Sequence, residues 1–134
     1  MTNQPSRVAF FIRSATGNET DLRQQRRLLE KELFSRGLDA SGFSLEIYQD
    51  THQSGLGHGP EFQRMNRDIA EGKIDVLMVS RMNRISRVLS ELMKFTRLVA
   101  SHRVRFISAR ENVDSIQSTL MSNVQAYIPH LIGA

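Results

Sequence analysis

Residues 8–25 read VAFFIRSATGNETDLRQQ, and this stretch decides the fold. Its continuous apolar run, Val8–Ile12, predicts a strand that is covered on both faces of a sheet. Arg13 ends the run, and a polar loop with hydroxyl side chains precedes a helical pattern. A buried strand that passes through a loop into a helix is typical of α/β domains. An arginine beside hydroxyls at the carboxyl end of such a strand indicates chemistry on a phosphate.

The rest of the sequence continues this alternation. An amphipathic helix, capped by Asn18 or Thr20, is predicted to run to about Arg36, where Gly37 ends it. Further strands are predicted at 43–48, 74–79 and 104–108, and further helices at 60–71, across 89–99 and from about residue 118. This order predicts a three-layer α/β/α domain over residues 1–116, with a mostly parallel sheet of four to five strands.

The composition fits one soluble domain. The chain has 134 residues, of which 40% are hydrophobic and 24% are charged. The absence of cysteine excludes a disulfide framework and a thiolate metal site. Because the sequence has neither a secretory signal nor an apolar run of about 20 residues, we expect a cytoplasmic protein without a membrane segment.

The charge is modestly basic, with a formal net charge of +4 and a pI near 10.1. Of the 18 basic residues only Lys31, Lys73 and Lys94 are lysines. The planar guanidinium of arginine holds a phosphate at two points, whereas lysine is a point charge. This balance fits a nucleic acid or another phosphate partner, and it equally fits an ordinary solvated surface.

Polar segments follow three of the predicted strands, at residues 13–18, 50–59 and 80–87. In an open parallel sheet the ligand binds beyond the carboxyl ends of the strands. Arg84 and Arg87 are three residues apart, and at a helix start they would project from one face. With Arg13 they would form a cage for a phosphodiester. The sequence has no carboxylate pair or metal-ligand spacing, which disfavours a metal-dependent nuclease.

Taken singly, these residues also fit structural roles. The arginines could lie on a solvated helix start capped by Asn83 or Ser86. Ser54 would then belong to a turn, and Asp50 would cap a strand end. The occurrence of all of them at one edge of the sheet favours a functional site.

The combination resembles the catalytic domain of the serine recombinase family, which includes resolvases, invertases and large serine integrases. The segments that carry the resemblance are FIRSAT (11–16), DLRQQ (21–25), DTHQSG (50–55), PEFQRM (60–65), GKIDVLMVSRMNRISR (72–87) and VRFISARENVDS (104–115). They occur in the family's order and at similar spacing over nearly the whole chain. We therefore expect a resolvase-like fold.

The resemblance implies a specific chemistry. The family's serine attacks a DNA phosphodiester, forms a covalent 5′-phosphoserine link and frees a 3′ hydroxyl, with no metal and no cofactor. Four subunits cut both duplexes, rotate one half and rejoin the strands. The resemblance assigns phosphate binding to Arg13, Arg84 and Arg87. It assigns supporting roles in the active site to Gln25, Asp50 and Ser54.

The sequence departs from the family pattern at three positions. Ala15 occupies the place of the nucleophilic serine, and a methyl group cannot attack phosphorus. Ser14 is the substitute at hand, although neighbouring side chains on a strand face opposite ways. Asn83 replaces an aspartate, and Gly59 stands where an arginine often precedes the proline. We therefore expect a recombinase domain that does not cleave DNA as written.

Two other interpretations remain. A recombinase-like module without catalysis could act in assembly or regulation of an active recombinase. A flavodoxin-like nucleotide-binding domain suits the α/β order, but the loop after the first strand has only Gly17 as a glycine.

The expected partners are DNA and further copies of the chain. We expect weak, salt-sensitive binding that does not depend on DNA sequence, because no DNA-reading motif is present. Residues 117–134 resemble the start of the family's oligomerisation helix and predict a dimer or tetramer in the full-length protein. The DNA-reading region is expected beyond this segment, and the resemblance implies a bacterial or phage origin.

Overall fold

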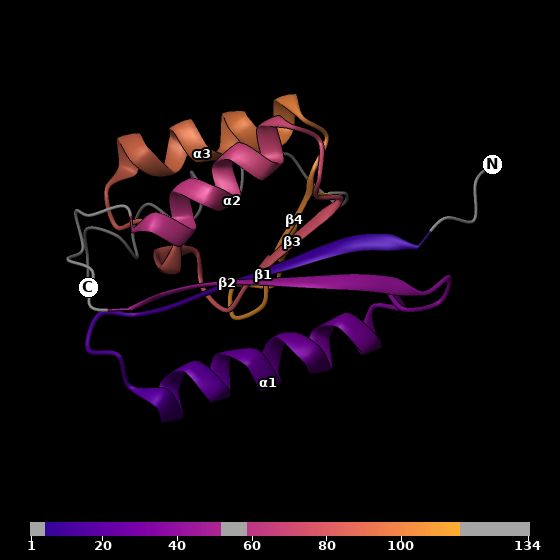
Figure 1. The fold of residues 1–134 in the computed structure, drawn as a ribbon, viewed down its shortest axis with the longest axis horizontal. Helices are drawn as coiled ribbons and strands as arrows, with labels where there is room; N and C mark the ends of the chain where they lie inside the picture. Colours follow the sequence, from indigo (N-terminus) through magenta and orange to yellow (C-terminus); the bar gives the residue numbers. More distant parts are fainter. Residues whose placement is uncertain (1–4, 52–58, 116–134) are drawn as a thin grey trace.

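The computed structural model describes residues 5–51 and 59–115, which form an α/β/α sandwich (Figure 1). The five-stranded sheet has the order β2-β1-β3-β4-β5, in which only β5 runs antiparallel to its neighbour. Helix α1 covers one face of the sheet, and α2 and α3 cover the other. The strands are β1 (Ser6–Ser14), β2 (Phe43–Thr51), β3 (Val76–Val79), β4 (Arg105–Ser108) and β5 (Val113–Asp114). The helices are α1 (Glu19–Ser35), α2 (Pro60–Ala70), the 3-10 helix η1 (Met82–Arg84) and α3 (Leu89–Ser101). The predicted fold class is confirmed.

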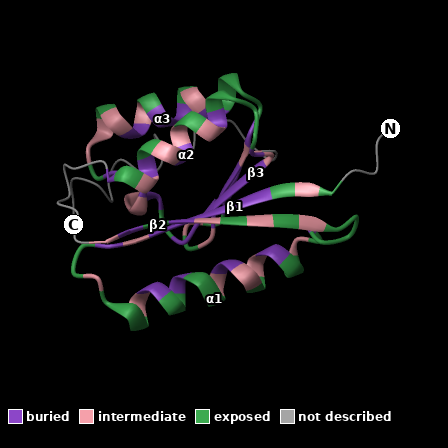
Figure 2. Cartoon of the chain, viewed as in Figure 1, coloured by how far each residue is buried: buried purple, intermediate pink, exposed green. Residues whose placement is uncertain are grey.

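The alternation of side chains along β1 explains why the sheet needs both helical layers. Val8, Phe10 and Ile12 pack in the cluster under α1, and Ala9 and Phe11 pack in the cluster under α2 and α3. All five are buried, so the apolar run of β1 has no solvent-facing side (Figure 2). The helices bury the stripes that the sequence predicts: Leu22, Leu29 and Leu33 on α1, and Phe62, Met65 and Ile69 on α2.

The ends of α1 are set by the residues that the sequence indicates. Asn18 is the N-cap, and its side-chain oxygen accepts a hydrogen bond of 3.0 Å from the backbone N–H of Asp21. Gly37 adopts a φ of 69°, and the N–H of Leu38 then reaches the carbonyl of Leu33. This Schellman ending brings the chain back towards β2.

The predicted helix from about residue 118 lies outside the described residues, and so does Ser54. Among residues 5–51 and 59–115, no helix has the length and apolar character that a bilayer crossing requires.

Candidate functional site

The carboxyl ends of β1, β2 and β3 meet at one edge of the sheet. Arg13 of β1 lies opposite Asp50 of β2 in the parallel register, and β3 continues through Ser80 into η1. The pairing of β1 with β3 extends only to Phe10 and Met78. The end of β1 therefore projects past its inner neighbour, and its polar groups need other partners.

Arg13 and Arg84 hold each other's backbones. The Nε of Arg13 donates to the carbonyl of Arg84, and its Nη2 donates to the carbonyl of Asn83, both at 3.2 Å. In return, the Nη1 of Arg84 donates to the carbonyl of Arg13 at 3.2 Å. These reciprocal bonds fix the position of η1 against the end of β1, although the two residues are 71 positions apart.

Gln25 fixes the backbone of Arg13. Its Oε1 accepts from the N–H of Arg13 at 3.2 Å, and its Nε2 donates to the carbonyl of Arg13 at 2.9 Å. The same Nε2 donates to Asp21 at 3.1 Å. Gln25 is only 4% exposed. Its buried amide therefore satisfies the N–H and the carbonyl of Arg13, which a neighbouring strand would otherwise bond.

The arginines form a cluster with excess positive charge. Burial lowers the pKa of Arg13, and the positive charges of Arg84 and Arg87 lower it further, while Asp50 opposes the shift. The nearest carboxylate of Arg84 belongs to Asp21, at 3.6 Å. Such a cluster is electrostatically suited to an anion, which would relieve the repulsion between the arginines.

Within the part of the chain that the structure describes, two polar atoms at this cluster are buried without a hydrogen-bond partner: the Nε of Arg84 and the Oδ1 of Asn83. Buried polar groups in folded proteins are nearly always bonded, so each exception needs a reason. A bound ligand that supplies an acceptor would satisfy the Arg84 Nε.

The placement of Arg84 and Arg87 on one helix face was wrong. Arg84 ends the 3-10 helix η1, and Arg87 is exposed in the segment before α3, which starts at Leu89. The Oγ of Ser86 accepts from the N–H of Val88 at 2.9 Å, a local turn that competes with a continuous helix. Neither Asn83 nor Ser86 caps α3, whose N-cap residue is Val88. Arg87 still acts electrostatically on Arg13.

Asp50 caps a helix. Its carboxylate is buried and accepts from the N–H of Glu61 at 3.0 Å and of Phe62 at 2.9 Å, in the first turn of α2. A Cβ added at Gly59 would overlap this carboxylate. The glycine that departs from the family pattern is therefore the residue that lets Asp50 approach α2.

Ser14 and Ala15 lie in different environments. Ser14 is the last residue of β1 and is 4% exposed, and its Oγ accepts from the N–H of Asn18 at 3.1 Å. The same Oγ lies 3.3 Å from the hydroxyl of Thr16. Ala15 is exposed in the loop that follows. Of these two neighbours, position 15 is therefore the one accessible to a substrate.

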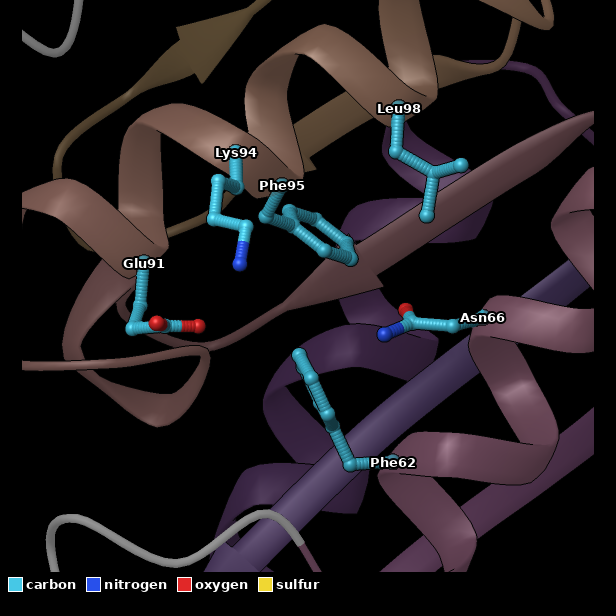
Figure 3. Close-up of a pocket in the computed structure, with 6 residues that line it drawn as sticks. All are labelled: Phe62, Asn66, Glu91, Lys94, Phe95 and Leu98. Atoms are coloured by element: carbon cyan, nitrogen blue, oxygen red, sulfur yellow. The ribbon is translucent and has the colours of Figure 1, made fainter.

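A cavity of about 300 Å³ lies between α2 and α3, on the far side of the sheet from α1 (Figure 3). Its lining consists of Phe62, Asn66, Glu91, Lys94, Phe95 and Leu98. It contains none of the arginines at the sheet edge, so it is separate from the candidate site. In the part of the chain that the structure describes, no group of three histidines, cysteines or carboxylates could hold a metal.

Comparison with known proteins identifies the family. The sequence profile "Resolvase, N terminal domain" matches residues 8–132. The chain belongs to the resolvase N-terminal domain family. No curated protein sequence matches the chain significantly.

Solved structures of serine recombinases share this resolvase fold. The N-terminal catalytic domain of TP901-1 integrase matches with a TM-score of 0.74 and 23% identity, over 96% of this chain and 94% of that one. A resolvase family site-specific recombinase from Streptococcus pneumoniae matches with a TM-score of 0.72 and 20% identity, over 92% and 85%. At these identities the likeness establishes the fold alone.

One residue at this candidate site was not singled out from the sequence. Asp21 contacts both Gln25 and Arg84, and thus links α1 to the arginine cluster. Its position four residues before Gln25 on a helix was the available signal, because such residues are neighbours on one face. Gln25 and Arg84 both hydrogen-bond the backbone of Arg13.

Proposed function

We propose that the chain is the catalytic domain of a serine site-specific DNA recombinase, and that Ala15 makes it unable to cleave DNA. The observation that carries this proposal is the arginine cluster at the end of β1. Arg13 and Arg84 are locked to each other's backbones, Arg87 adds a third positive charge, and the exposed position 15 follows directly.

The reaction needs a hydroxyl at position 15. A serine there would attack the phosphorus of a DNA phosphodiester, forming a P–O bond to its Oγ and breaking the bond to the 3′ oxygen. Rejoining is the reverse, in which the 3′ hydroxyl attacks the phosphoserine. Phosphoryl transfer depends mainly on positioning and on stabilisation of charge at the phosphorus oxygens. Arg13, Arg84 and Arg87 would supply that stabilisation without a metal.

The geometry disfavours Ser14 as a replacement nucleophile. Its Oγ is buried and already accepts a backbone hydrogen bond from Asn18. Attack would require Ser14 to leave this position and expose the start of α1. A chain with Ala15 therefore keeps the phosphate-binding groups and loses the reaction.

A second candidate function rests on Ala15 itself. A domain that binds DNA and pairs with other subunits, but does not cut, would regulate an active recombinase through mixed assemblies. DNA as partner and self-association belong to both candidates.

Formation of a covalent adduct tests the proposal. The Ala15→Ser variant, in the full-length protein with its recombination-site duplex, should form a protein–DNA adduct that survives denaturation in the presence of a chelator. The unaltered protein should form none. In the Ala15→Ser background, Arg84→Gln should slow adduct formation by about a hundredfold, in the range found for loss of one charge-stabilising group.

Other outcomes are equally informative. An adduct from the unaltered protein that disappears in Ser14→Ala would make Ser14 the nucleophile and contradict the assignment of position 15. If Ala15→Ser binds the site but forms no adduct, the non-catalytic module becomes the better explanation.

A further inference from the structure

Another cavity, lined by three arginines, lies beside the arginine cluster, where α1, η1 and the turn between β4 and β5 meet. Its volume is about 180 Å³, which holds a phosphate group and a few waters, since one water occupies about 30 Å³ in the liquid. Its lining residues are Asp21, Gln24, Gln25, Leu28, Ser80, Arg81, Arg84 and Arg110. Gln25 and Arg84 also belong to the candidate site, whereas Arg13 and Ala15 do not line the cavity, so the cavity borders the position assigned to the reacting phosphate.

The charge of this cavity is predominantly positive. Three arginines face one carboxylate, that of Asp21. Asp21 is already engaged, because Arg84 lies 3.6 Å from it and Gln25 donates to it at 3.1 Å. Within residues 5–51 and 59–115, the guanidinium groups of Arg81 and Arg110 have no carboxylate within 4.0 Å. Two cationic groups are thus available to an anion.

Two residues that line this cavity have buried polar atoms without partners within residues 5–51 and 59–115. Ser80 is 4% exposed, and its Oγ has no hydrogen-bond partner. The Nε of Arg84 is in the same situation. A hydroxyl donor and a guanidinium donor, both buried beside free arginines, fit the oxygens of a phosphate.

The backbone around the cavity is fixed. The N–H of Arg110 donates to the carbonyl of Ser80 at 2.9 Å, and the N–H of Arg84 donates to the carbonyl of Arg81 at 3.0 Å. The carboxylate of Glu111 accepts from the N–H of Met82 at 3.3 Å and from the hydroxyl of Ser108. The acidic neighbour of Arg110 is therefore bound elsewhere and does not neutralise it.

We propose that this cavity is a second phosphate subsite, which holds a backbone phosphate of bound DNA other than the one that faces position 15. The inference rests on the proposed function, because it takes DNA as the ligand. Arg84 belongs to both sites, so it couples them. Contacts to a non-reacting phosphate set the register of the duplex and hold the reacting phosphate in place.

The salt dependence of DNA binding tests this subsite. Each phosphate contact contributes about 0.9 to the slope of log K against log salt concentration. For a short duplex, Arg110→Gln should lower the slope by about 0.9 and weaken binding about tenfold at 50 mM salt. Arg103→Gln is the matched control. Arg103 is an exposed arginine just before the amino end of β4, whereas the cavity lies at the carboxyl ends of the strands. This control variant should leave the slope unchanged.

A second variant removes no charge. Ser80→Ala should weaken binding several-fold and leave the slope unchanged, because it removes one neutral donor. If Arg110→Gln gives the same slope of log K against log salt concentration as the unaltered chain, the proposed subsite is wrong. Saturation of the cavity by inorganic phosphate, seen as NMR shifts of Ser80 and Arg110 that duplex DNA does not displace, would also overturn the subsite, since the ligand would then be free phosphate.

The two proposals fail separately. If the Ala15→Ser variant forms its adduct while Arg110→Gln binds with an unaltered slope, the recombinase assignment stands and the subsite falls. If the unaltered chain does not bind duplex DNA at 50 mM salt, the subsite loses its ligand and falls as well.

Discussion

The ends of β1 and β2 lie side by side, with Arg13 opposite Asp50, and yet they serve opposite purposes. The carboxylate of Asp50 is buried and bonded to the first turn of α2. The guanidinium of Arg13 is partly buried among like charges, and burial together with those charges lowers its pKa. The end of β2 stabilises the fold, and the end of β1 gathers like charges, to which the proposed function assigns phosphate binding.

The two strand ends differ in how many of their buried polar atoms have hydrogen-bond partners. At the β2 end both carboxylate oxygens of Asp50 have backbone partners. At the β1 end the Nε of Arg84 and the Oδ1 of Asn83 have no partner among the described residues. Incomplete satisfaction and like-charge repulsion reduce stability, and proteins retain them where a ligand completes the site.

Removal of Asp50 should have the largest effect on stability. Asp50→Ala leaves two N–H groups at the start of α2, one buried and one partly buried, without their acceptor and should lower the free energy of unfolding by about 2–3 kcal/mol. Urea denaturation followed by circular dichroism measures the change. Asp39→Ala is the control, because Asp39 is exposed, and it should change the stability by less than about 0.5 kcal/mol.

An Asp50→Asn variant separates capping from charge. It keeps an acceptor oxygen and should fall between the unaltered protein and Asp50→Ala. If Asp50→Ala unfolds at the urea concentration of the unaltered protein, the description of the β2 end as the stabilising one is incorrect.

Loss of the Gln25 amide should lower stability through the end of β1. Gln25→Leu keeps an apolar side chain on α1 but leaves the N–H and carbonyl of Arg13 without the amide, at a cost of about 1–3 kcal/mol. The exposed neighbour Gln24 supplies the control, since Gln24→Leu removes no hydrogen bond to Arg13. Equal stability of the two variants would show that Gln25 does not position Arg13.

Much of this edge could be predicted from the sequence. The apolar run that ends at Arg13 predicted β1, and Gly37 predicted the end of α1. Both signals depend only on neighbouring residues. The order of the strand and helix patterns gave the layers. These features depend on periodicity and on backbone preferences that a single segment carries.

Two features could not be predicted from neighbouring residues in the sequence. The partners of Asp50 are 11 and 12 residues away across a loop, so its capping role required the relative position of β2 and α2. The position of Arg84 beside the end of β1 involves reciprocal bonds with Arg13, 71 residues away. Tertiary contacts of this kind override the local helical pattern.

The smallest expected effect has the opposite sign. Arg87 is exposed, and its charge acts on Arg13 as repulsion. Arg87→Gln should therefore raise the free energy of unfolding by about 0.2–0.5 kcal/mol in 20 mM salt, the usual size of an exposed like-charge contact. In 500 mM salt the gain should vanish, because screening then acts within about 4–5 Å. A gain that persists in high salt would have another cause than charge, and a loss of stability would mean that Arg87 supports the fold. Either result would contradict the view that the β1 end retains positive charge at the expense of stability.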